Sequence, residues 1–266
     1  MTTLILGRPL PDRPGFAATV RSERIKLTSV RSTWWTLAAM VLIGAGGTTL
    51  ICWGNADWLA SSGADESAGS FITWGMMIAQ VCAIVLGTLV VTGEYGTGMI
   101  RSTLAATPMR GRVLAAKAVV LTSVLFVVGT ATALLGYAGG NYFLDRAGVG
   151  LALEGDVAQS MYGNGLFMAG LGLFAGAVGF ILRHTAATLS AVLALMLVVT
   201  NMVLLIPGDT GRWITKLMPG NAGSVVATPV PFNPNLLDAW TGFGVFTAEL
   251  AVLVLAGWLV LRRRDA

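Results

Sequence analysis

The chain has 266 residues, of which 55% are hydrophobic and only 11% are charged, with a net charge of +4 and a mean hydropathy of +0.75. A soluble domain typically carries about 25% charged residues, so this composition excludes a chain that covers itself with polar surface. We therefore expect an all-α integral membrane protein that crosses the bilayer several times.

The first 34 residues form a charged segment without the basic, apolar and small-residue order of a secretory signal. At helical spacing, its residues 16–34 place an apolar stripe on one side, although Glu23 falls within the stripe and Ile25 lies opposite it. We expect an N-terminal interfacial amphipathic helix on the membrane surface. The alternative is a charged flank that only orients the first span. The stripe consists of Phe16, Val20, Leu27, Val30 and Trp34.

Six apolar runs follow, each close to the roughly 20 residues that a helix needs to cross about 30 Å of hydrocarbon. They lack the alternation of barrel strands, so helices are predicted. The predicted spans are residues 35–53, 71–92, 116–140, 165–182, 185–206 and 241–261. Together they form a six-span transmembrane domain over residues 35–261, followed by a cytoplasmic tail, 262–266. The fourth span is rich in Gly and Ala, which predicts close helix packing. Only Arg183 and His184 separate the fourth span from the fifth, which predicts a tight hairpin.

Charge sets the expected orientation. With both termini cytoplasmic, every basic residue except Arg146, Arg212 and Lys216 falls on the inner side, as the positive-inside rule requires. The net positive charge thus reflects topology. The basic residues show no aromatic–basic pattern of a nucleic-acid module, so no nucleic-acid partner is expected.

The loop between the second and third spans, about residues 93–115, is the most polar internal part of the chain. Glu94 and Arg101 are seven residues apart and would share one face of a helix, which Pro108 should end. We expect a short polar helix at the membrane surface that a cytosolic partner can bind and displace. The alternative is a positively charged loop in which Glu94 pairs with Arg101.

Three stretches resemble the membrane subunit of bacterial ABC-2 type ABC transporters: "RSERIKLTSVRSTWW" at 21–35, "TGEYGTGMIRSTLAATPMRGRVLAAK" at 92–117 and "ITKLMPGNAG" at 214–223. The resemblance implies a connecting helix before the first span, and a coupling helix after the second span that docks into a cytosolic ATPase subunit. It also implies a dimer with a second permease copy or a paralogue. Its most specific part is the set Glu94, Tyr95, Gly98, Arg101 and Leu104, and it assigns ATPase coupling to the first four of these residues.

The resemblance also implies that the second and fifth spans line the pathway, and here they offer Trp74, Met77 and Asn201. Glu249 lies about nine residues into the sixth span, where an ionisable group is costly and is a functional hypothesis by default. The alternatives are a position near the outer interface, if the span starts later, and a structural hydrogen bond inside the bundle. The outer segment 207–240 is rich in Pro, Gly and Asn. It predicts re-entrant or extracellular helices, with Gly220 and Asn221 between two half-helices.

No phosphate-binding loop, catalytic set or metal-ligand spacing occurs in the sequence. Cys52 and Cys82 lie in apolar runs and suit packing. The chain is therefore not expected to be an enzyme or to hold a cofactor; ATP and Mg²⁺ would be bound by the partner ATPase.

The expected function is the permease subunit of an ATP-driven exporter in the bacterial cytoplasmic membrane. It would move an amphipathic or lipid-like substrate, such as a drug, peptide or glycolipid. Two alternatives stay open. A secondary transporter would need an internal repeat, which is not visible, and an accessory membrane protein would bind a partner without transporting anything.

Overall fold

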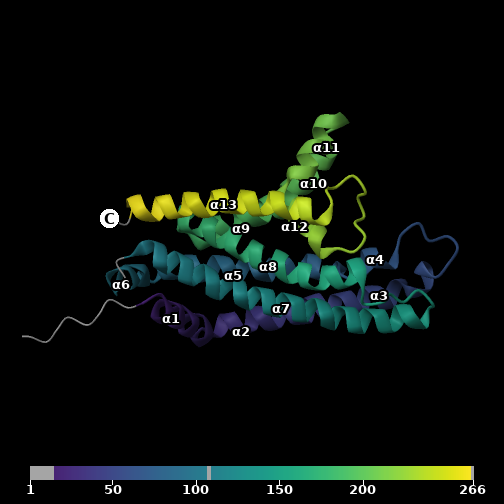
Figure 1. Ribbon diagram of the computed structural model, residues 1–266, viewed down its shortest axis with the longest axis horizontal. Helices are drawn as coiled ribbons and strands as arrows, with labels where there is room; N and C mark the ends of the chain where they lie inside the picture. Colours follow the sequence, from purple (N-terminus) through teal and green to yellow (C-terminus); the bar gives the residue numbers. More distant parts are fainter. Residues whose placement is uncertain (1–14, 107–108, 265–266) are drawn as a thin grey trace, which may run out of the picture.

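The computed structural model describes residues 15–264 except 107–108, and Figure 1 shows long helices that lie side by side along one axis. Six helices are long and apolar enough to cross a membrane, which confirms the predicted six-span, all-helical architecture. Throughout the described residues there is no β-strand. The six are Arg31–Leu59, Ala68–Gly96, Arg110–Arg146, Gly155–Leu182, Thr185–Leu205 and Ala239–Arg263.

The spans are built from shorter elements where the helical geometry changes. The first span contains a π-helical turn, η1, and the fifth contains a π-helical stretch, η2, and a 3₁₀ turn, η3. The elements are α1 (Phe16–Ser29), α2 (Arg31–Val41), η1 (Leu42–Gly46), α3 (Gly47–Leu59), α4 (Ala68–Phe71), α5 (Trp74–Gly96), α6 (Met99–Ala106), α7 (Arg110–Arg146), α8 (Gly155–Leu182), α9 (Thr185–Leu193), η2 (Ala194–Val199), α10 (Thr200–Met202), η3 (Val203–Leu205), α11 (Gly208–Leu217), α12 (Pro219–Ser224), η4 (Val225–Ala227) and α13 (Ala239–Arg264).

The N-terminal segment forms two helices, whereas the sequence predicted one over residues 16–34. Helix α1 ends at Ser29, Val30 is extended (φ −88°, ψ 121°), and α2 then begins the first span. The break lets α1 pack against α7 while α2 packs along α5. Of the predicted apolar stripe, Leu27 is buried within the protein, whereas Phe16, Val30 and Trp34 are exposed; its contact with the membrane surface stays a prediction. Residues 1–14 of this segment lie outside the described residues.

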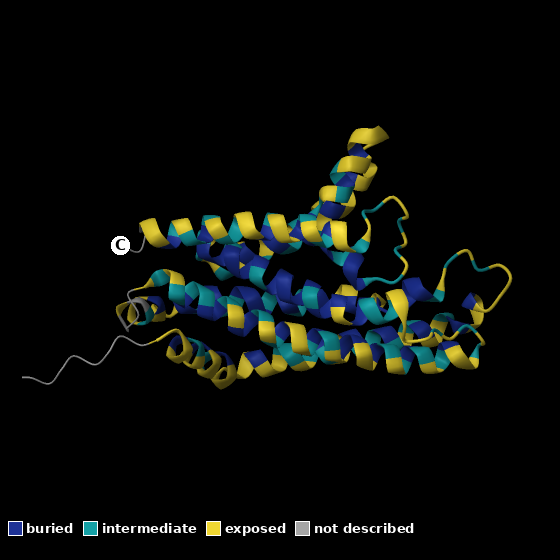
Figure 2. Cartoon of the chain, in the orientation of Figure 1, coloured by how far each residue is buried: buried dark blue, intermediate teal, exposed yellow. Residues whose placement is uncertain are grey.

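The core lies where α5, α7 and α8 meet, and Figure 2 shows buried residues concentrated along α8 while outward sides of α2 and α13 are exposed. The helices approach closely at glycines. A Cβ atom on Gly87 of α5 would overlap the carbonyl oxygen of Gly172 in α8, so this contact requires a small residue, as predicted for the fourth span. Large apolar side chains such as Leu42 and Val252 are exposed on the outside, which suits a bundle whose solvent is lipid.

The predicted hairpin between the fourth and fifth spans is confirmed. Helix α8 ends at Leu182, Arg183 adopts left-handed backbone geometry (φ 58°), and α9 begins at Thr185. The Nδ1 atom of His184 accepts a hydrogen bond from the backbone N–H of Ala187. The histidine therefore caps the N-terminus of α9.

The two ends of the bundle carry different elements (Figure 1). At the end that we call the α6 end lie α1, α6 and the C-terminal end of α13. There Arg110 at the start of α7 donates to the carbonyl oxygens of Leu261 and Arg262 at 2.8 and 3.1 Å. At the opposite α12 end lie α12, η4 and α11, which projects away from the bundle.

At the α12 end, the predicted break between Gly220 and Asn221 is wrong. The chain breaks instead at Met218, which is extended (φ −64°, ψ 128°), and Gly220 and Asn221 lie inside α12. Pro219 explains the shift, because proline disfavours helical geometry in the residue before it and suits the first position of a new helix.

Candidate functional site

The polar loop between the second and third spans is shorter than the sequence predicted. Glu94 and Tyr95 lie in the last turn of α5, and Arg101 lies on the separate helix α6. Gly98 turns the chain between the two helices with φ 73°, a conformation that glycine adopts at little cost. The prediction that Glu94 and Arg101 share one helix face is therefore wrong. Pro108, predicted to end this helix, lies outside the described residues; α6 ends at Ala106.

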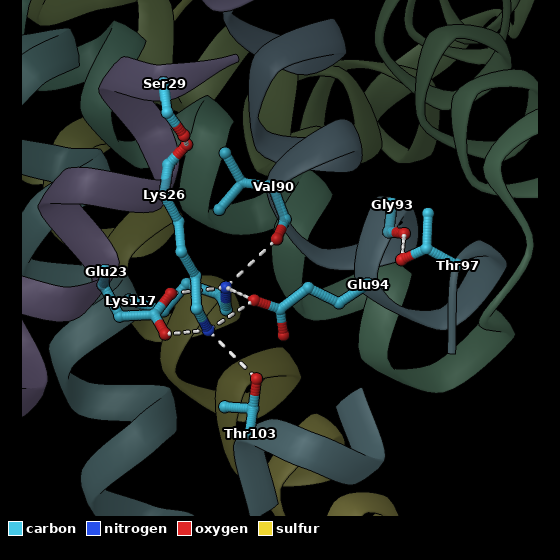
Figure 3. Close-up of polar contacts among 9 residues, drawn as sticks. All are labelled: Glu23, Lys26, Ser29, Val90, Gly93, Glu94, Thr97, Thr103 and Lys117. Atoms are coloured by element: carbon cyan, nitrogen blue, oxygen red, sulfur yellow. Dashed lines mark hydrogen bonds and ion pairs between the residues drawn. The ribbon is translucent and has the colours of Figure 1, made fainter. Parts of the chain in front are cut away.

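Four charged side chains from three helices meet beside this turn (Figure 3). Glu23 and Lys26 come from α1, Glu94 from the end of α5 and Lys117 from α7, and we call them the four-charge cluster. The Nζ atom of Lys26 lies 2.7 Å from Glu23 Oε1 and 2.9 Å from Glu94 Oε1. The Nζ atom of Lys117 lies 2.7 Å from Glu23 Oε2 and 3.0 Å from Glu94 Oε1. The cluster thus joins three helices by charge-assisted hydrogen bonds.

The four-charge cluster is buried and electrically balanced. The side chains of Glu23, Glu94 and Lys117 are 4%, 6% and 5% exposed, while that of Lys26 is 28% exposed. Two carboxylates face two ammonium groups, so no net charge is buried. Since a buried charge without a partner is strongly destabilising, each member of the cluster depends on the other three.

Every N–H donor of the two ammonium groups is used. An ammonium carries three donors; the third of Lys26 goes to Thr103 Oγ1 of α6 at 3.0 Å, and the third of Lys117 goes to the Val90 carbonyl oxygen at 3.1 Å. On the acceptor side, Glu94 Oε2 is buried and has no hydrogen-bond partner among the described residues. The bond from Lys26 to Thr103 links α6 to the four-charge cluster.

The two cluster residues of α1 have shifted pKa values. Burial by itself raises the pKa of Glu23, but attraction and hydrogen bonds from Lys117 and Lys26 outweigh it and lower that pKa below its usual 4.5. Burial likewise lowers the pKa of Lys26, but hydrogen bonds to Glu23 and Glu94 outweigh it and raise that pKa above 10.5. Both groups therefore stay charged around neutral pH.

Of the four residues predicted to couple to an ATPase, only Glu94 belongs to the four-charge cluster. Tyr95 packs edge-to-face on Phe180 of α8, with ring centroids 6.5 Å apart, and the Arg183 guanidinium lies 5.2 Å over its ring. Arg101 is exposed on α6. The alternative in which Arg101 pairs with Glu94 is also wrong, because Lys26 and Lys117 take that carboxylate.

Sequence reasoning missed the other members of the cluster. Glu23 stood out as a flaw in an otherwise apolar stripe, and Lys117 lies inside the third apolar run. A charged residue in an apolar stripe or an apolar run is expected to be buried and therefore to need a partner of opposite charge. The positions of Glu23 and Lys117 in the sequence do not identify the partner of either residue.

A second feature lies at the α12 end, where an open cavity of about 230 Å³ is lined by residues of α5, α8, η2, α10, α12 and the segment after η4. Three residues predicted for the substrate pathway, Trp74, Met77 and Asn201, line it together. Trp74 begins α5 and Glu94 lies near its end, so one continuous helix of roughly 30 Å joins the cavity to the four-charge cluster.

Glu249 belongs to neither feature. It is half-buried on α13 and lies outside the lining of the cavity. Its Oε2 atom is buried without a hydrogen-bond partner within residues 15–264 as described. The hydrogen bond inside the bundle that is the alternative role for Glu249 is therefore not made by this oxygen.

No protein-family model matches the chain, and no curated protein matches it. The class is defined by the fold: six span-capable helices make the chain a multi-pass helical membrane protein. Among the described residues, no group of three or more His, Cys, Asp or Glu side chains could hold a metal ion.

Proposed function

We propose that the chain is the membrane-spanning permease subunit of an ATP-driven ABC-2 type exporter in the bacterial cytoplasmic membrane. It binds separate cytosolic ATPase subunits, which hold ATP and Mg²⁺, and pairs with a second copy or a paralogue. The proposed orientation has both termini and α6 in the cytoplasm, and it is supported by the basic residues, which concentrate on the segments at the α6 end as the positive-inside rule expects. The cargo is amphipathic or lipid-like and is moved outward.

The observation that carries this proposal is the hydrogen bond from Lys26 to Thr103, which ties α6 to the four-charge cluster. A displacement of α6 by a docked ATPase changes the position of Thr103 and thereby acts on Lys26. Lys26 is bonded in turn to Glu23 and to Glu94 at the end of α5. A displacement of α6 thus acts on α1 and α5 together.

Helix α5 then carries the displacement to the cavity at the α12 end. The helix is continuous over 23 residues and buried against α8 for much of its length. Its first residue, Trp74, and Met77 line the cavity. A rigid shift of α5 therefore changes the cavity walls, which is what coupling of ATP hydrolysis to transport requires.

The proposal is tested by co-purification from the native host. Tagged wild type is solubilised, and ATP hydrolysis is measured on the eluate. Arg101→Glu reverses a charge exposed on α6, and the matched control Arg212→Glu reverses one on α11 at the other end. We expect hydrolysis to accompany wild type and Arg212→Glu and to be lost with Arg101→Glu.

If wild type brings down no ATP hydrolysis, the ABC assignment fails and the secondary transporter becomes the leading hypothesis. Equal hydrolysis with all three proteins would show that α6 is not the docking site. An ATPase that co-purifies without any transport of cargo would favour the accessory protein.

A further inference from the structure

The cavity at the α12 end is uncharged and combines apolar side chains with several polar ones. No Asp, Glu, Lys, Arg or His side chain is among the described residues that line it. Side-chain amides line it instead: Gln80, Asn164, Asn201, Asn221 and Asn233. A charged group bound there would lose its hydration and find no opposite charge, which is costly. The walls therefore favour a neutral ligand.

Four of these amides donate to backbone carbonyl oxygens of the protein. Asn164 makes two such bonds, and Gln80, Asn201 and Asn221 make one each, so one of the two N–H donors of each of these three amides has no protein acceptor among the described residues. Gln80 Nε2 donates to the Met77 carbonyl oxygen at 2.7 Å, and Asn201 Nδ2 donates to that of Leu197 at 2.6 Å. Because a backbone carbonyl can only accept, these bonds fix which end of each amide is nitrogen. The other two donate in the same way: Asn221 to Thr215, and Asn164 to Ser160 and Ala227.

The amide oxygens are left as acceptors. Across the part of the chain that the structure describes, no protein group donates to the side-chain oxygen of any of these four residues. The hydroxyls of Thr200, Ser224 and Thr228 also donate to backbone carbonyl oxygens, which leaves their lone pairs free. The cavity thus offers amide oxygens as acceptors together with the remaining amide N–H donors, and it suits an uncharged ligand whose groups both donate and accept hydrogen bonds. Hydroxyl groups have this property.

An apolar groove adjoins the cavity. It has a volume of about 280 Å³ and is lined by Trp74, Met77, Ile78, Val81 and Leu197. Trp74, Met77 and Leu197 line both spaces, so the cavity and the apolar groove lie directly beside each other along α5. Met77 and Ile78 are more than half exposed, on a side of α5 that faces lipid in a membrane protein. The combined site carries side-chain amides at one end and is apolar at the other.

We propose that this combined site binds an amphiphile whose head is uncharged and rich in hydroxyl groups, like a sugar, and whose tail is apolar. The head lies in the cavity and donates to the amide oxygens, while the tail lies in the groove along α5. The inference rests on the proposed function only in taking this amphiphile as the cargo; the binding itself requires no ATPase.

The test uses the full chain, purified into phosphatidylcholine nanodiscs. Three photoreactive probes share one octyl tail and one pyranose ring: a glucoside (neutral), a glucosaminide (cationic) and a glucuronide (anionic). Crosslinks are mapped by peptide mass spectrometry. We expect the glucoside to label residues 74–81 with an affinity at least about tenfold above either charged probe, because a charged head lacks a partner in the cavity.

A matched pair of variants separates the cavity from general effects of charge. Asn201→Asp places a carboxylate in the cavity wall. Asn55→Asp makes the same change in α3, where Asn55 Nδ2 donates to the Ile51 carbonyl oxygen four residues earlier, as Asn201 does, but outside the cavity. We expect Asn201→Asp to shift the preference toward the glucosaminide by roughly tenfold, and Asn55→Asp to label like wild type.

Equal labelling of wild type by all three probes would mean that only the tails partition into lipid, and would overturn the proposal. So would equal behaviour of the two variants. Selective labelling by the glucoside in a protein that co-purifies no ATPase would retain the binding site and reject the exporter. If the protein co-purifies an ATPase but shows no selective labelling, the exporter proposal is retained and the binding site is rejected.

Discussion

Replacing Lys117 by methionine should destabilise the protein more than any surface change of charge. Lys117 is 5% exposed and donates to Glu23, Glu94 and the Val90 carbonyl oxygen. Without it, two buried carboxylates share the single ammonium of Lys26. Breaking a buried ion pair by removing one partner costs about 3–5 kcal/mol, which corresponds to a fall of roughly 6–20 °C in melting temperature for a chain of this size.

The assay is thermal unfolding of the purified protein in one detergent, followed by circular dichroism. Lys216→Met is the control, since Lys216 lies in α11 and contacts the Trp213 ring at 5.2 Å; we expect a change within about 0.5 kcal/mol. Adding Glu94→Gln to Lys117→Met restores the balance of charge. The double variant should therefore lose less stability than the sum of the single losses, by about 0.5–3 kcal/mol.

Two results would refute this reasoning. If Lys117→Met melted like Lys216→Met, the four-charge cluster would not hold the helices together. If Lys117→Met and Glu94→Gln were strictly additive, the two residues would act independently, against the 3.0 Å contact between them.

Three further predictions follow from the same contacts. Because the folded pKa of Glu23 lies below its usual 4.5, its charge stabilises the fold above pH 4.5, and this stabilisation is lost as the pH falls through the folded value; the melting temperature of wild type should drop on acidification below pH 4.5, and that of Glu23→Gln should drop less. A Gly87→Ala variant should lose stability or fail to assemble α5 against α8, because the added Cβ meets backbone. Gly93→Ala in the same helix, where nothing lies within 4 Å, should gain up to about 1 kcal/mol from helix propensity; equal melting of the two alanine variants would contradict the close helix contact. Thr103→Val should leave ATPase co-purification intact and reduce cargo moved per ATP hydrolysed, measured in proteoliposomes; unchanged coupling would remove the Lys26–Thr103 bond from the mechanism.

Several features of this protein could be predicted from local sequence. The six spans follow from the length of the apolar runs, because a helix in lipid must satisfy its own backbone hydrogen bonds. The hairpin at Arg183 and His184 followed from the absence of any longer connection. The helix breaks at Gly98 and just before Pro219 also had local signals, a glycine and a proline. The predicted helix ends were nevertheless at other residues.

The partners of Glu94 could not be predicted in this way. The sequence offered Arg101, seven residues away, whereas the structure pairs Glu94 with Lys26, which is 68 residues away, and with Lys117, which is 23 residues away. Gly98 turns the chain between α5 and α6. Glu94 and Arg101 are therefore close in sequence but do not pair in the structure.

The sequence by itself determined that this protein crosses a membrane six times as helices, because hydrophobic run length and backbone hydrogen bonding are local properties. Only the tertiary structure decided which charges neutralise one another and which residues line the cavity. Trp74 and Asn201 line the same cavity because the start of α5 and α10 both border it. Such meetings depend on how helices pack, and packing depends on side chains far apart in the chain.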